Sequence, residues 1–376
     1  NKIIEEGHAD MISMARPFLA DPYFVQKAIE DKADEINTCI GCNQACLDHV
    51  FKRKIASCLV NPQACHETEL VYEPVKKPKN IAVVGAGPAG LAFSTVAAQR
   101  GHKVTLFDAS NEIGGQFNIA KQIPGKEEFY ETLRYFSKRI DNTGVDLNLN
   151  TRVSPNDLKG FDVVILSTGI KPRALSIDGI NHSKVINYLD VLKDKKEVGN
   201  KVAIIGAGGI GFDVAEYLTH KGESTALNVS SFLKEWGIDH QLNSRGGIEG
   251  VEPVVVESPR EIFLMQRKES KIGAGLGKTT GWVHRISLKN KNTKMINAVQ
   301  YDKIDDQGLH YTRRGVQQIL AVDNVIICAG QLSNNEMLKP LEEMGKQVHL
   351  IGGADLALEL AAKHAINQGS RLAAEI

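Results

Sequence analysis

The feature that most constrains the fold is a glycine-rich turn between a short apolar run and a helix of small residues. Residues 81–84, IAVV, predict a buried strand, and G-x-G-x-x-G follows it directly. A second strand at residues 104–107 ends in an acid. The first glycine permits a tight turn, the second lets backbone approach a pyrophosphate, and the third lets the helix pack against the strand. The pattern therefore predicts a dinucleotide site formed by Gly85, Gly87, Ala89, Gly90 and Asp108.

A second copy of this pattern begins at residue 201. KVAIIGAGGIG is again a strand followed by G-x-G-x-x-G, with a helix expected over residues 212–220. An irregular polar insert is expected over residues 223–259, before the next strand. That strand is followed by two cations instead of an acid, which suits the 2′-phosphate of NADP, although a solvated loop is the alternative. The predicted residues of this second site are Gly206, Gly208, Gly211, Arg267 and Lys268.

Three further stretches are predicted to face the first dinucleotide. The loop after its acid carries two glycines and an amide, strand 161–166 runs into Ser-Thr-Gly, and IGGAD near the C-terminus opens a helix to about residue 367. Ligands of open α/β sheets lie at the carboxyl ends of strands, and a helix N-terminus suits the phosphate of a flavin. The C-terminus would thus complete the first fold, with the second fold inserted. The residues concerned are Gln116, Thr168, Gly169, Gly353 and Asp355.

The cysteines are concentrated between residues 39 and 65, with the spacing C-x2-C-x3-C-x11-C for the first four. Such a cluster, in a nucleotide-binding chain without a visible signal peptide, argues for a metal site in a reducing compartment. Four thiolates bind zinc or an iron–sulfur cluster. Three crowded cysteines with a lone fourth favour a [4Fe–4S] cluster over paired zinc knuckles. The predicted ligands are Cys39, Cys42, Cys46 and Cys58, whereas Cys65 is expected to be a buried thiol and Cys328 a core residue of a strand.

Residues 1–37 are expected to form two short helices with a strand between them, over residues 10–18. Elements this short cannot bury a core alone. They either pack against the next domain or are the last βα unit of a TIM barrel whose remainder is missing. Arg16 at the strand exit would then suit a phosphate, as in the loops after the last barrel strands, although a surface arginine is the simpler interpretation.

Composition excludes several classes of function. Lys+Arg and Asp+Glu both number 45, so the formal net charge is zero. This balance gives no indication of binding to nucleic acid or to an anionic membrane. No apolar run approaches the roughly 20 residues of a membrane span, and no signal peptide is visible. We therefore expect a cytoplasmic protein with a small-molecule substrate and without nucleic-acid or membrane partners. A monomer is expected, although the sequence does not determine the oligomeric state.

Several of these stretches together resemble a known family. GAGPAG, LFDASNEIGGQFNIAKQIPGK, the inserted GAGGIG, IGGADLALEL and the cysteine run CIGCNQACLDHVF are similar to the FAD- and NADPH-binding half of bacterial NADPH-dependent 2,4-dienoyl-CoA reductases. The wider iron–sulfur flavoprotein family includes trimethylamine dehydrogenase and enoate reductases. The resemblance covers essentially the whole chain.

The resemblance implies electron flow from NADPH to FAD, to a [4Fe–4S] cluster, to FMN and to a dienoyl thioester during β-oxidation of unsaturated fatty acids. It also implies that Arg16 touches the FMN phosphate. The barrel that holds most FMN contacts and the substrate-protonating acids maps onto no residue of this sequence. No catalytic residue is therefore predicted, and the chain is expected to oxidise NADPH through FAD without reducing a dienoyl-CoA.

The predicted fold class is α/β, with two Rossmann-like domains, the second inserted in the first. The expected domains are the end of an FMN-binding barrel (1–37), a [4Fe–4S] segment (38–70), an FAD domain (71–195 and 321–376) and an NADPH domain (196–320). The alternatives are another iron–sulfur flavoprotein electron donor, resembling glutamate synthase or NADH oxidase, and a redox-silent nucleotide sensor. A disulfide reductase would need a cysteine pair near the flavin, which neither nucleotide fold contains.

Overall fold

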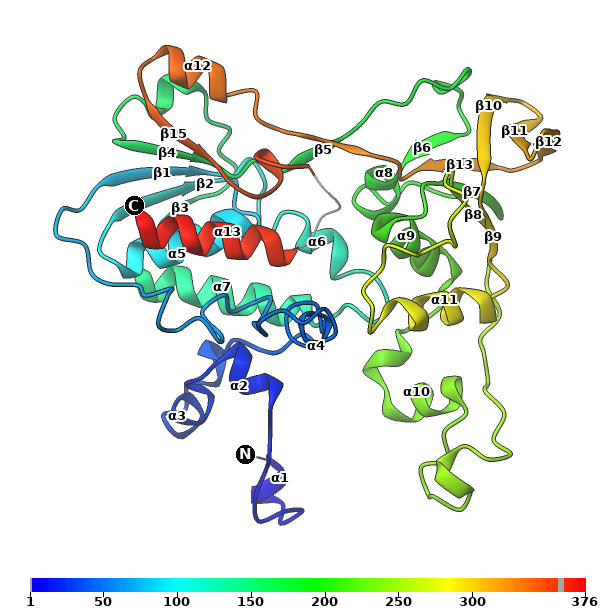
Figure 1. Ribbon diagram of the computed structural model, residues 1–376, viewed down its shortest axis with the longest axis horizontal. Helices are drawn as coiled ribbons and strands as arrows, with labels where there is room; N and C mark the ends of the chain where they lie inside the picture. Colours follow the sequence, from blue (N-terminus) through cyan, green and yellow to red (C-terminus); the bar gives the residue numbers. More distant parts are fainter. Residues whose placement is uncertain (1, 358–361) are drawn as a thin grey trace. The chain divides into compact units, whose positions relative to one another are not determined.

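The computed structural model describes residues 2–357 and 362–376, so the end of the C-terminal IGGADLALEL motif, where the last helix was expected, lies outside the described residues. The chain divides into two compact units (Figure 1). The first unit comprises Asn1–Asn118, Glu128–Lys171 and Leu332–Ile376, and the second comprises Ile119–Glu127 and Pro172–Gln331.

A parallel five-stranded sheet forms the centre of the first unit, in the order β15-β4-β1-β2-β3. Alternate residues of its central strands enter different cores. Ile81 and Val83 pack in one cluster, whereas Ala82 and Val84 pack in another on the opposite face. Both faces are therefore covered, which explains the uninterrupted apolar sequence of β1. The strands are β1 (Asn80–Val84), β2 (Lys103–Phe107), β3 (Asp146–Asn148), β4 (Val163–Leu166) and β15 (Gln347–Leu350).

Helices α5 (Pro88–Gln99) and α13 (Ala362–Glu375) lie side by side in the first unit (Figure 1). Their close approach depends on a glycine, because a Cβ on Gly369 would stand 2.4 Å from the carbonyl oxygen of Ala89. Helix α7 (Phe129–Thr143) also contacts α5, and α12 (Leu338–Glu343) contacts β15.

The N-terminal segment contains the short helices α1 (Lys2–Glu5), α2 (Arg16–Ala20), α3 (Phe24–Ile29) and α4 (Leu47–Val50). The strand predicted over residues 10–18 is wrong. Residues 11–14 are irregular, and α2 takes up the remainder. A barrel strand is stable only beside neighbouring strands, and within the described residues no strand pairs with this stretch. A role as the end of a barrel therefore stays a prediction.

The second unit repeats the arrangement of the first. Its parallel sheet has the order β6-β13-β7-β8-β9, in which β7, β8 and β9 follow one another as β1, β2 and β3 do. A three-stranded antiparallel sheet accompanies it. The strands are β6 (Val185–Asn187), β7 (Lys201–Ile205), β8 (Glu261–Met265), β9 (Lys294–Ile296), β13 (Asn324–Ile327), and β10 (Val299–Asp305), β11 (Gly308–Arg313) and β12 (Val316–Leu320) of the antiparallel sheet.

Two sequence predictions for the second unit need correction. Helix α9 (Gly209–Thr219) begins three residues earlier than expected, because it starts within the glycine loop itself. The insert at 223–259 is not irregular throughout, because it contains helix α10 (Val229–Trp236), capped by the side chain of Asn228. The remaining helices of the unit are α8 (Tyr188–Leu192) and α11 (Gly281–Asn290), and α6 (Phe117–Ala120) spans the residues at which the chain enters it.

A two-stranded ribbon, β5 (Ile170–Pro172) with β14 (Gln331–Ser333), contains two of the points at which the chain passes between units. Among the described residues, no helix is both long and apolar enough to cross a membrane.

Candidate functional site

The first glycine loop has the geometry of a phosphate-binding turn. Gly85 has a φ of +109°, and a Cβ there would stand 2.5 Å from the carbonyl oxygen of Ser167. A Cβ on Gly90 would stand 2.0 Å from the carbonyl oxygen of Gly85, so α5 packs directly on the turn. By contrast, a Cβ on Gly87 would meet nothing within 4 Å. The backbone at Gly87, which caps α5 without a side-chain hydrogen bond, is therefore open to a ligand.

The acid after β2 lies beside this loop. Asp108 accepts hydrogen bonds from the backbone N–H of Ala86 (2.6 Å) and of Ser110 (2.7 Å). These bonds fix the carboxylate next to the glycine turn. An ionised carboxylate has about four acceptor positions, so capacity for a ribose hydroxyl remains.

The glycine pair that follows Asp108 packs onto the first loop. The N–H of Gly114 donates to the carbonyl oxygen of Ala86 (2.8 Å), and a Cβ on Gly115 would stand 3.1 Å from the Cα of Gly87. Gln116 comes next and lies half-buried in the turn before α6. The structure thus brings this loop to the residues predicted to hold the first dinucleotide.

The other predicted residues gather at the carboxyl ends of β4 and β15. The hydroxyl of Thr168 donates to the carbonyl oxygen of Asn334. A Cβ on Gly353 would stand 3.0 Å from the carbonyl carbon of Gly169, so the two turns touch. Asp355 is fixed by the Nε2 of Gln368 (2.7 Å). Because these ends share one sheet edge with the glycine loop, the donor set fits an extended dinucleotide such as FAD.

The second glycine loop reproduces the first. Gly206 has a φ of +110°, with a Cβ position 2.7 Å from the carbonyl oxygen of Cys328, and Gly208 caps α9 without a side-chain hydrogen bond. Two exposed cations, Arg267 and Lys268, follow β8. Within the described residues, neither side chain makes an ion pair or a hydrogen bond. This donor set fits a phosphorylated nicotinamide nucleotide.

Sequence reasoning missed two contacts that acids of α9 make with distant side chains. Lys126 Nζ lies 2.5 Å from Asp213 Oδ1, and His284 Nδ1 lies 2.8 Å from Glu216 Oε1. Burial raises the pKa of Asp213 from its usual range. The available signal was the pair of acids on α9, three residues apart in an otherwise apolar helix.

The four predicted cysteine ligands line one pocket in the first unit, together with Arg16. Three of them, Cys39, Cys42 and Cys58, also pack against the core that contains β1 and α5. Burial raises the pKa of Cys42, and it raises the pKa of Cys58 to about 12. Cys65 does not line the pocket, and the expectation that it is a buried thiol is wrong, because its side chain is exposed.

Four thiols line this pocket, which is the donor set of a thiolate-bound metal centre. No group of three or more His, Cys, Asp or Glu side chains in the described chain is arranged to hold one metal ion. The preference for an iron–sulfur cluster over zinc therefore rests on the spacing of the cysteines in the sequence. Backbone N–H groups of Gln44, Val60 and Asn61 are directed at the sulfurs of Cys42 and Cys58, as suits thiolates.

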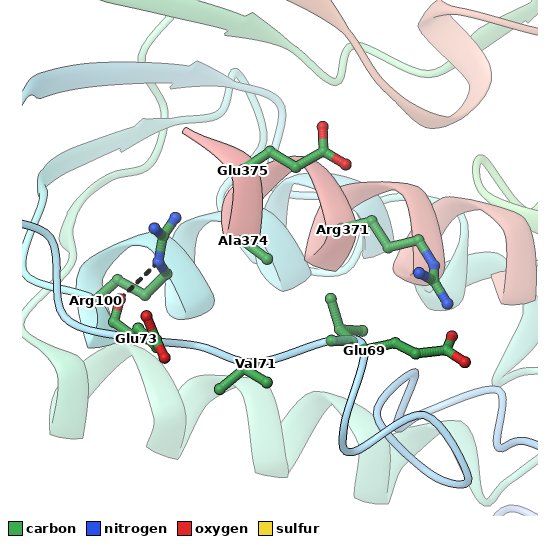
Figure 2. A pocket seen from close by; sticks show the side chains of 8 residues that line it. Glu69, Val71, Glu73, Arg100, Arg371, Ala374 and Glu375 are labelled. Atoms are coloured by element: carbon green, nitrogen blue, oxygen red, sulfur yellow. Dashed lines mark hydrogen bonds between the residues drawn. The ribbon is translucent and has the colours of Figure 1, made fainter.

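A second pocket contains none of the predicted site residues. Figure 2 shows that it lies beside α13, with side chains from segment 69–73, from Arg100 at the end of α5 and from α13 around it. One of its two arginines, Arg100, donates to the carbonyl oxygens of Glu73 and Ala373, so this cation joins segment 69–73 to the end of α13. The lining residues are Glu69, Leu70, Val71, Glu73, Arg100, Arg371, Ala374 and Glu375.

Comparison with known proteins agrees with these two nucleotide folds. Residues 79–363 match the pyridine nucleotide-disulphide oxidoreductase family over most of the chain. The chain belongs to this family. The predicted α/β fold with Rossmann-like sheets is thereby confirmed, and oxidoreductase activity with flavin and NAD(P) is supported as a class.

Relatives and one solved structure extend the likeness beyond the matched residues. The chain is 33% identical to a metal reductase of Desulforamulus reducens, over 94% of this chain and 52% of that protein. It is 30% identical to an NADH oxidase of Thermoanaerobacter brockii, over 94% of this chain and 50% of that protein. A 2-naphthoyl-CoA reductase structure superposes with a TM-score of 0.85 at 29% identity, covering 100% of this chain and 52% of that one. The chain thus spans about half the length of these relatives.

Proposed function

We propose that this chain is the electron-input half of an NADPH-dependent iron–sulfur flavoprotein reductase. The observation that carries the proposal is that four cysteines line one pocket in the same unit, and against the same core, as the first glycine loop. A flavin-type loop and a four-thiol pocket sharing one core suit electron transfer over a short distance.

In this proposal, the first unit binds FAD. The N–H groups at the start of α5, beside Gly87, bind the pyrophosphate, and Asp108 accepts a ribose hydroxyl. Thr168, Gly169 and Asp355, with the Gln116 amide, position the rest of the flavin at the ends of β4 and β15. These roles follow from where the backbone is open and where the acids are already fixed.

The second unit binds NADPH by the same device. The loop from Gly206 to Gly211 receives the pyrophosphate, and Arg267 and Lys268 bind the 2′-phosphate. Because both cations are exposed and unpaired within the described chain, they favour NADPH over NADH without first breaking an ion pair.

The cysteine pocket holds a [4Fe–4S] cluster through Cys39, Cys42, Cys46 and Cys58. When bound, the flavin and the cluster supply the exchange between two-electron hydride chemistry and single-electron transfer. The chain's own contribution is to fix the four thiols around one pocket and to direct backbone N–H groups at two of them.

For the whole protein we propose 2,4-dienoyl-CoA reduction, which rests on the sequence resemblance. The names of the relatives support a reductase of conjugated or thioester substrates more broadly, since they include a cinnamate reductase and a 2-naphthoyl-CoA reductase. In the full-length protein FMN would receive the electrons. This chain carries no acid assigned to protonate a substrate, so we expect NADPH oxidation with an artificial acceptor and no turnover of a dienoyl-CoA.

The test is an anaerobic NADPH titration of the purified, reconstituted chain, followed by absorption and by identification of the released flavin. Bleaching of FAD together with a broad iron–sulfur shoulder is the expected result. Bleaching without iron or sulfide would restrict the function to an NADPH:flavin reductase, as in the NADH-oxidase-like alternative. An unchanged flavin spectrum would contradict the proposal and favour a redox-silent nucleotide-binding module.

A further inference from the structure

Arg16 is the charged residue of the cysteine pocket. The other lining residues that the structure describes are cysteines and neutral side chains, and Arg16 shares the pocket with all four predicted ligands. Its guanidinium donates a hydrogen bond of 2.5 Å to Oδ1 of Asn43, which lies in the loop between Cys42 and Cys46. A fixed positive charge therefore stands beside a site built for thiolates.

The segment that carries Arg16 is anchored independently of the cysteine side chains. Ala20, at the end of α2, is buried in the core of the first unit. The side-chain amide of Asn61 donates to the carbonyl oxygen of Leu19 (2.9 Å), and Asp21 accepts from the N–H of Asn37 (2.8 Å). These contacts anchor the backbone of α2, which carries Arg16, and the bond to Asn43 holds its guanidinium at the pocket.

We propose that Arg16 is a positioning residue that favours the reduced form of the cluster held by the four cysteines, and so raises its reduction potential. This inference rests on the proposed function. Four thiolates give the site a negative charge, and reduction adds one electron without making or breaking a bond. A nearby guanidinium stabilises the more negative state by Coulomb attraction, and net charge is one of the factors that set cluster potentials.

The expected effect is moderate because the Arg16 side chain is exposed to solvent and ions. A second cation, Lys363, lies in electrostatic range of Cys42 and remains in place when Arg16 is removed. We expect Arg16→Gln to lower the equilibrium constant for cluster reduction severalfold and at most about tenfold, which is ~59 mV for a one-electron couple. Arg16→Lys keeps the charge and should retain most of the potential.

The experiment is an anaerobic redox titration with dithionite of the reconstituted wild type, Arg16→Gln, Arg16→Lys and a matched control, Lys76→Gln. Lys76 is an exposed cation in the irregular stretch before β1 and lies outside the pocket. The potential is read from the cluster's absorption or electron paramagnetic resonance, at low and at high salt. The proposal is supported if only Arg16→Gln has a lowered potential and if its difference from the wild type shrinks as salt is added. A purely structural role would not respond to salt.

The two proposals fail in different ways. If the wild type binds no iron or sulfide after anaerobic reconstitution, the proposed function is wrong and this inference falls with it. If the wild type binds a cluster, and the cluster's reduction potential in Arg16→Gln equals that in Lys76→Gln, the proposed role of Arg16 is wrong while the proposed function stands. A potential lowered equally in Arg16→Lys and Arg16→Gln would also overturn the electrostatic role.

Discussion

The Cα of Gly211 packs against the carbonyl oxygen of Gly206, because a Cβ at Gly211 would stand 1.8 Å from that oxygen. The same relationship joins Gly90 to Gly85 in the first unit, where the distance is 2.0 Å. In both units the third glycine of the motif thus allows the helix to start directly on the turn. The opposing atom is backbone, so it cannot move aside as the end of a side chain would.

Gly211→Ala should therefore impair the second site alone. Overpacking of this kind costs about 1–3 kcal/mol of unfolding free energy, and displaced N–H groups at the start of α9 would weaken NADPH binding by at least about tenfold. FAD content should be unchanged. The measurements are thermal unfolding, flavin content and NADPH titration. Gly160→Ala is the control, since a Cβ there meets nothing within 4 Å; wild-type NADPH binding by Gly211→Ala would contradict the packing argument.

Removing both cations after β8 should change coenzyme preference. Arg267→Ala/Lys268→Ala is expected to raise the KM for NADPH about 10- to 100-fold, since charge-assisted hydrogen bonds contribute about 1.5–3 kcal/mol. The KM for NADH should stay nearly constant, because no 2′-phosphate is present to lose contacts. Steady-state flavin-dependent reduction of an artificial acceptor measures both values. Lys289→Ala, which removes an exposed cation from α11, is the control; an equal loss with both coenzymes would refute the assignment.

An ion-pair group in the antiparallel sheet gives a pH-dependent prediction. Lys303 Nζ (2.9 Å) and His310 Nε2 (2.8 Å) flank the carboxylate of Asp305. The hydrogen bond from Lys303, then that from His310, holds the pKa of Asp305 well below its usual range. A lowered pKa means that the stabilisation is present above the unfolded value, about 3.9, and is lost as pH falls through the folded value.

Asp305→Asn should therefore lower the melting temperature at pH 7, with a difference from wild type that narrows as the pH is brought below about 4. Thermal unfolding followed across this range is the measurement. Asp194→Asn, an exposed carboxylate without an ion pair in the described part of the chain, should show no such narrowing. A pH-independent difference for Asp305→Asn would mean that the carboxylate acts through packing and not through its charge.

The elements that sequence predicted well are those with strong local signals. The strand at residues 81–84 is apolar on both faces, and the glycine loop after it strongly restricts the backbone conformation. As a result, β1 and α5 lie where expected. The same holds for β7, apart from the early start of α9. Buried parallel strands and tight glycine turns are specified by neighbours in the sequence, which is why both units could be recognised.

The elements that sequence reasoning missed depend on distant neighbours. Residues 10–18 were expected to form a strand and its exit, yet without a partner strand in the described chain the first part is irregular and α2 begins at Arg16. Helix α10 lies in a polar segment that shows little helical pattern. The available sequence signal for its start was Asn228, whose side chain caps the helix. The pairing of Lys126 with Asp213 joins residues 87 positions apart, which no local pattern encodes. Likewise, the predicted cysteines and Arg16 could be selected by spacing and by resemblance, but their shared pocket could not.

The cysteine pocket makes the sharpest prediction about ligand identity. Cys58 lines the pocket, and the N–H groups of Val60 and Asn61 are directed at its sulfur, whereas Cys65 is exposed and lies outside the pocket. Cys58→Ser should therefore lose most iron and acid-labile sulfide after anaerobic reconstitution, and Cys65→Ser should retain wild-type amounts. Both variants should keep FAD, because neither cysteine contributes to the glycine loop. Wild-type iron content in Cys58→Ser, or loss in Cys65→Ser, would require a different fourth ligand.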